Sequence, residues 1–169
     1  DVAILLNITP DHLDRYDYKL ESYTASKFRI TENQTECDFL IYNADDALVN
    51  TIKTKANKLP ISLINEQTEG GYLNNNGLII KLNNQTMTIE ELALQGKHNM
   101  FNSMAVAMAA RVFEVKDAVI RQSMLDFQNV EHRLEHVLTV HGIDFINDSK
   151  ATNVNACWFA LESMQKDVV

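Results

Sequence analysis

The amino-acid sequence predicts an α/β fold, in which a mostly parallel sheet is flanked by helices and carries a small antiparallel meander. Residues 2–8 form a short, continuously apolar run, which is typical of a strand buried on both faces inside a parallel sheet. Apolar groups recur at helical spacing over residues 19–33, and "DFLIYN" at 38–43 is a second buried-strand candidate. Between residues 61 and 89, "NNNG" and "LNNQ" are turn signals that separate short β-rich runs and indicate the meander.

The second half of the chain adds helices and a hairpin. Its Ala and Met content favours a helix over residues 99–113, and a further helix is expected over 116–127. The segment "LEHVLTVHGIDFIND" alternates around Gly142 and predicts a hairpin, after which "NVNACWFALESM" is helical and "DVV" begins another strand. Because the chain opens directly into one strand and stops where another starts, we expect it to be a piece of a longer protein.

Composition excludes several classes of protein. A chain of 169 residues, 46% of them hydrophobic, can bury one sizeable core, so we expect one main domain and the beginning of a second. The formal net charge of -8, with no basic run, argues against a nucleic-acid partner. The isolated Cys37 and Cys157 indicate neither a disulfide framework nor a zinc site, which favours a reducing cytoplasm. No apolar run reaches the length of a membrane span, so no membrane partner is expected.

A lysine falls on the apolar side of the first predicted helix. Leu20, Tyr23, Lys27 and Ile30 are spaced by three, four and three, so Lys27 is expected to point toward the core. One interpretation is that its stem covers apolar surface while the ammonium group reaches water. The other starts from desolvation, which favours the neutral amine. A neutral amine can take up carbon dioxide and become a carbamate, an anionic oxygen ligand suited to magnesium.

The motif "DHLD" lies at the end of the first predicted strand, where ligands of open α/β sheets gather. His12 either binds a metal or caps local structure. Asp11 and Asp14 are candidate ligands, orienting partners of His12 or helix N-caps, and Arg15 can neutralise one of them. Spacing alone leaves these alternatives open.

Two further segments carry candidate binding residues. Asn99 and Asn102 share a face at the start of an apolar helix; capping is favoured for Asn99, whereas base or phosphate recognition better explains Asn102. In "HRLEH", Arg133 precedes a strand, where its planar guanidinium can hold a phosphate or sugar or make a surface ion pair.

The segment "INDSKATN", at residues 146–153, is the densest polar cluster and lies between a predicted strand and a helix. Asp148 suits a ribose hydroxyl, and Lys150 suits a developing phosphate charge. Thr152 or Asn153 can cap the next helix. The alternative is an ordinary polar loop that ends in a helix cap.

Taken in order, "NITPDHLDRY", "SKFRI", "NADDALV", "GKHNMFNSMAVAMAA", "HRLEHV" and "INDSKATN" resemble the Mur ligase family. The likeness spans nearly the whole chain, and "DHLDRY" with "NDSKATN" points to the D-glutamate-adding branch. The resemblance implies ATP-dependent amide formation in peptidoglycan synthesis. The carboxylate of UDP-N-acetylmuramoyl-L-alanine would take the γ-phosphoryl group of ATP, and the amine of D-glutamate would attack the acyl phosphate.

The resemblance also implies roles for single residues. His12, Lys27 and Lys150 would be the catalytic residues. Two of them would also bind metal: His12 would bind Mg²⁺, and carbamylated Lys27 would hold a second metal. The residues that would bind the nucleotide are Asn99, Asn102, Arg133 and Asp148. Of these, Asn102 would contact the adenine. Lys150 and Thr152 would contact the phosphoryl or glutamate end of the substrates.

The chain departs from the family pattern in one large respect. It contains no GxxxxGK followed by Ser or Thr, the phosphate-cradling loop that family members carry upstream. We therefore expect residues 1–152 to be part of the central ATPase domain without that loop, and residues 153–169 to start the C-terminal amino-acid-binding domain. The chain alone should have no ligase activity, and its sheet should expose an edge or an apolar face. The intact enzyme is expected to be monomeric.

Three rival hypotheses remain. The first is another Mur ligase or a folylpolyglutamate synthetase. The second is a nucleotide- or metal-binding module without chemistry, in which the polar motifs only bind ions or cap helices. The third, a metal hydrolase built on Asp11, His12 and Asp14, lacks the further ligand cluster that two-metal sites usually show.

Overall fold

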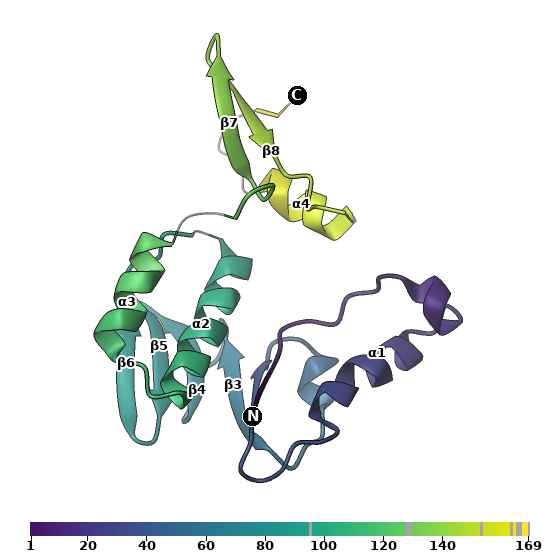
Figure 1. The fold of residues 1–169 in the computed structure, drawn as a ribbon, viewed down its shortest axis with the longest axis vertical. Coiled ribbons are helices and arrows are strands. Elements are labelled where there is room, and N and C mark those ends of the chain that lie inside the picture. The colour runs from purple at the N-terminus through teal and green to yellow at the C-terminus, as the bar shows by residue number, and fades with distance from the viewer. Residues whose placement is uncertain (95, 128–129, 153, 163, 165–166, 169) are drawn as a thin grey trace. The chain divides into compact units, whose positions relative to one another are not determined.

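The computed structural model describes residues 1–94, 96–127, 130–152, 154–162, 164 and 167–168. The chain forms two compact units, unit 1 (Asp1–Asp126) and unit 2 (Phe127–Val169) (Figure 1). The expected boundary between residues 152 and 153 falls at a residue outside those described, and that division into family domains stays a prediction. Among the described helices, none combines the length and the apolar character that a membrane span requires.

Unit 1 is built on one six-stranded sheet in the order β1-β2-β3-β4-β5-β6. β1 (Val2–Leu5), β2 (Phe39–Asn43), β3 (Asn57–Ser62) and β4 (Gly70–Asn74) are parallel neighbours. β5 (Gly77–Leu82) and β6 (Gln85–Ile89) then complete an antiparallel meander with β4. The predicted fold class is confirmed, and the meander extends the parallel sheet instead of forming a separate one.

Side-chain alternation along the parallel strands separates two cores, one on each face of the sheet. Leu40 and Tyr42 of β2 pack with Tyr23 of α1 (Leu20–Phe28) on one face. On the other face, Ile41 packs with Met104 of α2 (Lys97–Val112). α1 and α2 therefore cover opposite faces, as expected for strands that are apolar on both sides.

Short helices and α3 complete unit 1. η1 (Leu13–Tyr16) precedes α1, while η2 (Arg29–Thr31) and η3 (Val49–Thr51) flank β2 along the chain. α3 (Asp117–Asp126) is held to β6, because the Nε of Arg121 donates to the carbonyl oxygen of Thr88 at 2.8 Å. Arg111 of α2, with a largely buried side chain, pairs with Asp117 at the start of α3.

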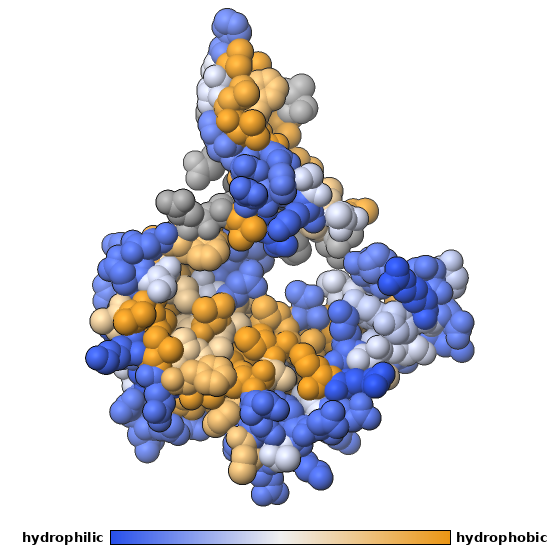
Figure 2. Space-filling model, viewed as in Figure 1, coloured by the Kyte–Doolittle hydropathy of each residue, from blue (hydrophilic) through white to orange (hydrophobic). Residues whose placement is uncertain are grey.

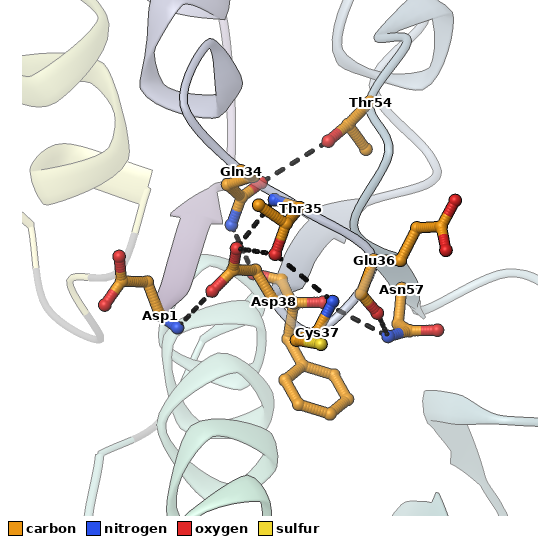
Figure 3. Close-up of polar contacts among 9 residues, drawn as sticks. Asp1, Gln34, Thr35, Glu36, Cys37, Asp38, Thr54 and Asn57 are labelled. Carbon is orange, nitrogen blue, oxygen red and sulfur yellow. Dashed lines mark hydrogen bonds and ion pairs between the residues drawn. The ribbon is translucent and has the colours of Figure 1, made fainter.

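A polar cluster joins the amino ends of β1, β2 and β3 (Figure 3). The Asp38 carboxylate accepts hydrogen bonds from the amino group of Asp1 and, at 2.6 and 2.8 Å, from the backbone N–H and the hydroxyl of Thr35. Asn57, the first residue of β3, donates from its amide to the carbonyl oxygen of Glu36 at 2.7 Å. The amino group of Asp1, followed by the two groups of Thr35, lowers the pKa of Asp38 to about 2.

Unit 2 consists of a hairpin and one helix. β7 (Glu135–Val140) and β8 (Ile143–Asn147) pair in antiparallel register around the predicted turn at Gly142, whose φ is 82°. α4 (Val154–Glu162) follows, as expected. The strand predicted at "DVV" is wrong for the described residues Asp167 and Val168, which lie in no strand, while residue 169 lies outside the described residues.

Hydrophobic side chains gather on the surface of each unit (Figure 2). On unit 1, Val106 of α2 and Phe113, which follows that helix, are exposed, and so is Ile4 of β1, the strand at one edge of the sheet. On unit 2, the strands of the hairpin carry exposed apolar residues, among them Val137 and Phe145. The expected exposure of an edge and an apolar surface is thus present in unit 1.

Candidate functional site

The "DHLD" segment, residues 11–14, follows the carboxyl end of β1 after the intervening residues 6–10. Asp46, which follows β2, anchors this end of the sheet. Its carboxylate accepts the backbone N–H of Ile8 at 3.2 Å and those of Leu48 and Val49 at 3.0 and 2.9 Å. Asp46 therefore joins the segments that leave two neighbouring strands. The spacing of residues in the "NADDALV" motif did not indicate that the Asp46 side chain would accept these backbone hydrogen bonds.

His12 is presented in an exposed, left-handed backbone conformation. Its φ is 49°, and 65% of its side-chain surface is exposed. The Asp11 carboxylate accepts the backbone N–H of His12 at 3.0 Å, and the imidazole Nε2 lies 3.8 Å from the same carboxylate oxygen. The next helical turn, η1, has no side-chain cap, so His12 does not cap local structure through its imidazole.

η1 packs on α1 through aromatic side chains. The rings of Tyr16 and Tyr23 meet edge to face, with centroids 5.2 Å apart, and the Tyr16 hydroxyl lies 3.4 Å from that of Ser26. Ser26 precedes Lys27 on the same helix. The structure therefore holds the end of the "DHLDRY" motif against the helix that carries Lys27.

Lys27 corrects one step of the sequence reasoning. The residue is exposed, and its Nζ lies 5.2 Å from the centroid of the Tyr23 ring, a cation–π contact. Tyr23 is buried and Leu20 half-buried, but Ile30 is exposed and lies beyond the end of α1, in η2. The predicted burial of the amine is therefore wrong for this chain, and the alternative, in which the ammonium reaches water, describes the structure.

The described residues do not form a magnesium site by themselves. Magnesium prefers hard oxygen ligands in near-octahedral geometry, whereas Lys27 offers a cation and His12 a single imidazole. No group of three or more His, Cys, Asp or Glu side chains within the described part of the chain is arranged to hold a metal. A carbamate on Lys27 would supply oxygen atoms, but further ligands would still be required.

Asn99 and Asn102 lie in the first two turns of α2. The N-cap of this helix is Gly96, whose φ is 98°, so the predicted capping role of Asn99 is wrong: Asn99 is the third residue of the helix. Asn99 is half-buried and Asn102 is exposed. The three-residue spacing does place the two amides on neighbouring positions of one helix face, as expected.

In unit 2, the hairpin brings two predicted binding segments together. The Asp148 carboxylate accepts the backbone N–H of Leu134 at 3.1 Å, and the backbone N–H of Lys150 donates to the carbonyl oxygen of His132 at 3.1 Å. Arg133 lies between these two contact points and is exposed, as is Lys150. The structure thus gathers Arg133, Asp148 and Lys150 at one end of the hairpin.

Thr152 is exposed, and its backbone N–H donates to the carbonyl oxygen of Lys150 at 3.0 Å. α4 begins at Val154, so Thr152 precedes the cap position. Asn153, the other predicted cap, lies outside the described residues.

Sequence reasoning gave no role to Glu135 or Asn147, which lie beside the predicted residues of unit 2. One Glu135 carboxylate oxygen, Oε2, accepts the backbone N–H of His132 at 2.8 Å and the side-chain amide of Asn147 at 3.2 Å. The sequence did place Glu135 near the start and Asn147 near the end of the predicted hairpin, which would have indicated that they lie beside each other. These ends pair directly, as Glu135 and Asn147 do in the register.

Comparison with known proteins adds to this geometry. The family described as the Mur ligase middle domain matches residues 1–110. A curated UDP-N-acetylmuramoylalanine--D-glutamate ligase from Christiangramia forsetii is 53% identical over 174 residues, a match that covers 99% of this chain. The chain spans only 39% of the length of that relative.

Two solved structures share the fold. MurF from Acinetobacter baumannii matches with a TM-score of 0.74 at 17% identity, over 97% of this chain and 38% of that one. A MurF ligase from Thermotoga maritima in complex with ADP matches with a TM-score of 0.67 at 16% identity, over 95% and 38%. With the family match over residues 1–110, these findings confirm the resemblance seen in the sequence, and the chain belongs to the Mur ligase family.

Proposed function

We propose that the full-length protein is the ATP-dependent ligase that joins D-glutamate to UDP-N-acetylmuramoyl-L-alanine in cytoplasmic peptidoglycan synthesis. The identity of 53% across 99% of the chain, to a relative named for this reaction, carries the proposal. It favours the D-glutamate-adding member over other Mur ligases and over a folylpolyglutamate synthetase. The acyl phosphate formed from the muramoyl-alanine carboxylate and ATP would be the species that the D-glutamate amine attacks.

In this proposal, the residues of unit 2 serve the nucleotide and the transferred phosphoryl group. Phosphoryl transfer depends mainly on positioning and on neutralising the charge that spreads over the phosphate oxygens. Arg133 and Lys150 supply exposed cations at one end of the hairpin, and Asp148 supplies a carboxylate for a ribose hydroxyl. Thr152 would contact the substrate beside Lys150.

The residues of unit 1 have complementary roles. Asn99 and Asn102, on one face of α2, would contact the nucleotide base, with Asn102 as the residue that discriminates adenine. His12 and carbamylated Lys27 would hold Mg²⁺ together with ligands from elsewhere in the intact protein. When bound, the metal would neutralise phosphate charge. These two residues would orient it, and the Tyr16 and Tyr23 pair keeps their segments together.

The substrate proposal is tested with the full-length protein. Phosphate release from ATP is measured in the presence of UDP-N-acetylmuramoyl-L-alanine and, in turn, D-glutamate, L-glutamate, L-lysine or meso-diaminopimelate. We expect turnover with D-glutamate only. Turnover that depends on another amino acid, or on a folate substrate, would reject the proposal in favour of another family member.

The Lys27 proposal has a readout that does not depend on turnover. The full-length protein is equilibrated with ¹³C-bicarbonate, and its carbamate carbon is observed by NMR at neutral pH. Lys27→Ala should remove one carbamate signal, whereas Lys116→Ala, which changes another exposed lysine, should retain it. An unchanged spectrum of Lys27→Ala would show that Lys27 is not carbamylated.

A further inference from the structure

Two loops of unit 2 are joined by side chains to which the proposed function assigns no role. The first loop, residues 132–134, leads into β7, and the second, residues 147–150, begins with the last residue of β8. Antiparallel pairing places Glu135 opposite Asn147, so the hairpin returns the second loop beside the first. The two loops carry Arg133 and Lys150, which the proposed function assigns to phosphate groups.

Glu135 and Asn147 connect both loops through hydrogen bonds. Oε2 of Glu135 accepts the His132 backbone N–H at 2.8 Å and the Nδ2 amide of Asn147 at 3.2 Å. The same Nδ2 lies 2.8 Å from the imidazole Nδ1 of His132, and the Asn147 Oδ1 accepts the backbone N–H of Ser149 at 3.1 Å. The side chains of Glu135 and Asn147 are therefore bonded to each other and to His132 of the first loop, and Asn147 is also bonded to Ser149 of the second loop.

The first loop needs such support because of its backbone. His132 and Leu134, the residues on either side of Arg133, have φ angles of 65° and 48°. This left-handed region is disfavoured for residues that carry a Cβ, and it persists only where surrounding contacts hold it. The contacts of Glu135 and Asn147 hold the His132 side, and the bond from the Leu134 N–H to Asp148 holds the other.

We propose that Glu135 and Asn147 are positioning residues, which fix the Arg133 loop to the Asp148–Lys150 loop so that both contact the phosphate groups of one nucleoside phosphate. This inference rests on the proposed function. A guanidinium binds phosphate through a fixed fork of donors, so a loop that aims it in advance avoids an ordering cost during binding. Neither Glu135 nor Asn147 needs to touch the nucleotide.

The chemistry of the network predicts which substitutions preserve it. Glu135→Gln keeps an oxygen that can accept both N–H donors, whereas Glu135→Ala removes the acceptor. Asn147→Asp removes the amide that donates to Glu135 at 3.2 Å. It puts a second carboxylate in its place, so a repulsion between like charges replaces the hydrogen bond. Asn147→Ala removes the donor without adding charge. Thr139→Val, on the same hairpin but bonded to Asp144 and His136 instead, is the matched control.

The experiment uses the full-length ligase. Calorimetry measures the Kd for ADP and for adenosine, and initial rates give kcat and the KM for ATP and for D-glutamate. We expect Glu135→Ala, Asn147→Ala and Asn147→Asp to raise the Kd for ADP and the KM for ATP about tenfold, in keeping with a lost hydrogen bond to a charged group. Adenosine binding and the KM for D-glutamate should stay within about threefold, and so should every constant of Glu135→Gln and Thr139→Val.

Each outcome decides a different question. A wild-type ligase that binds no ADP would reject the proposed function, and this inference with it. A wild type that binds ADP, with Asn147→Ala and Asn147→Asp binding it equally well, would overturn the inference alone. Equal losses for ADP and adenosine, or an equal loss in Thr139→Val, would also overturn it, because a general weakening of the unit would then be the cause. Should Glu135→Ala fail to fold, the two Asn147 variants decide.

Discussion

In the 169-residue chain alone, where the Asp1 amino group is free, Asp38 makes the stability of unit 1 depend on pH. Its folded-state pKa of about 2 lies below the ordinary value of 3.8, because the Asp1 amino group and Thr35 stabilise the carboxylate. A depressed pKa contributes stability that is fully present above pH 3.8 and is lost as the pH falls toward 2. We expect the free energy of unfolding of the 169-residue chain to fall more steeply over this window than that of Asp38→Asn.

Urea unfolding followed by circular dichroism between pH 2 and pH 6 measures this difference. Glu91→Gln, a change at another exposed carboxyl group, is the control and should keep the wild-type slope below pH 4. If Asp38→Asn and the wild type lose stability in parallel over the whole window, the network in Figure 3 does not hold the carboxylate in its charged form.

Lys27 shows what helical spacing can and cannot predict for a single residue. Spacing correctly placed Lys27 beside Tyr23, since the Nζ lies over the Tyr23 ring. It could not give the depth of burial, because burial depends on which other segments cover that helix face. The same limit applies to Asn99, where Gly96, and not the asparagine, takes the N-cap position of the helix.

At the scale of elements, the join between β3 and β4 depends on Gly70. This residue has a φ of 125°, and a Cβ added there would lie 2.0 Å from the backbone carbonyl oxygen of Pro60. A backbone atom cannot move aside without breaking the parallel pairing of Ile61 with Gly71. We expect Gly70→Ala to lower the free energy of unfolding of unit 1 by about 3 kcal/mol or more.

Chemical denaturation of the two alanine variants measures this effect. Gly142→Ala is the reference, since Gly142 also has a positive φ but a Cβ there would meet nothing within 4 Å. Gly142→Ala should lower the free energy of unfolding of unit 2 by about 1 kcal/mol, because alanine disfavours the left-handed conformation. Equal losses for the two variants would show that the contact with Pro60 relaxes freely.

Most elements were predictable because their apolar periods are clear. The strands around residues 2–8 and 38–43, the helices of residues 99–127 and the hairpin at Gly142 all appear, with ends shifted by a few residues. β3 was not predicted, because Pro60 interrupts its pattern. In the structure β4 pairs only with Ile61 and Ser62, so Pro60 has a strand neighbour on one side alone. Asp167 and Val168 were mistaken for the start of a strand because so short a segment carries too little pattern to decide.

At the scale of the whole molecule, the residues proposed for the reaction are divided between two units. His12, Lys27, Asn99 and Asn102 belong to unit 1, and the polar end of the hairpin belongs to unit 2. Each unit builds its share from local contacts, the tyrosine pair in unit 1 and the Glu135–Asn147 network in unit 2. Sequence motifs could name most of these residues but could not show which of them are joined, because hydrogen bonds between distant residues depend on the fold.

This division predicts how the 169-residue chain behaves alone. Its sequence holds no phosphate-cradling glycine-rich loop, and no described group of carboxylates and histidines is arranged for a metal. Without both, the spreading charge of a transferred phosphoryl group is not neutralised, and little catalysis remains. We therefore expect phosphate release from ATP by the purified chain to equal the buffer rate, with or without UDP-N-acetylmuramoyl-L-alanine and D-glutamate, while the full-length protein turns over under the same conditions. Release by the chain that requires D-glutamate and is abolished by Lys150→Ala would contradict this, because it would show that units 1 and 2 suffice for the chemistry.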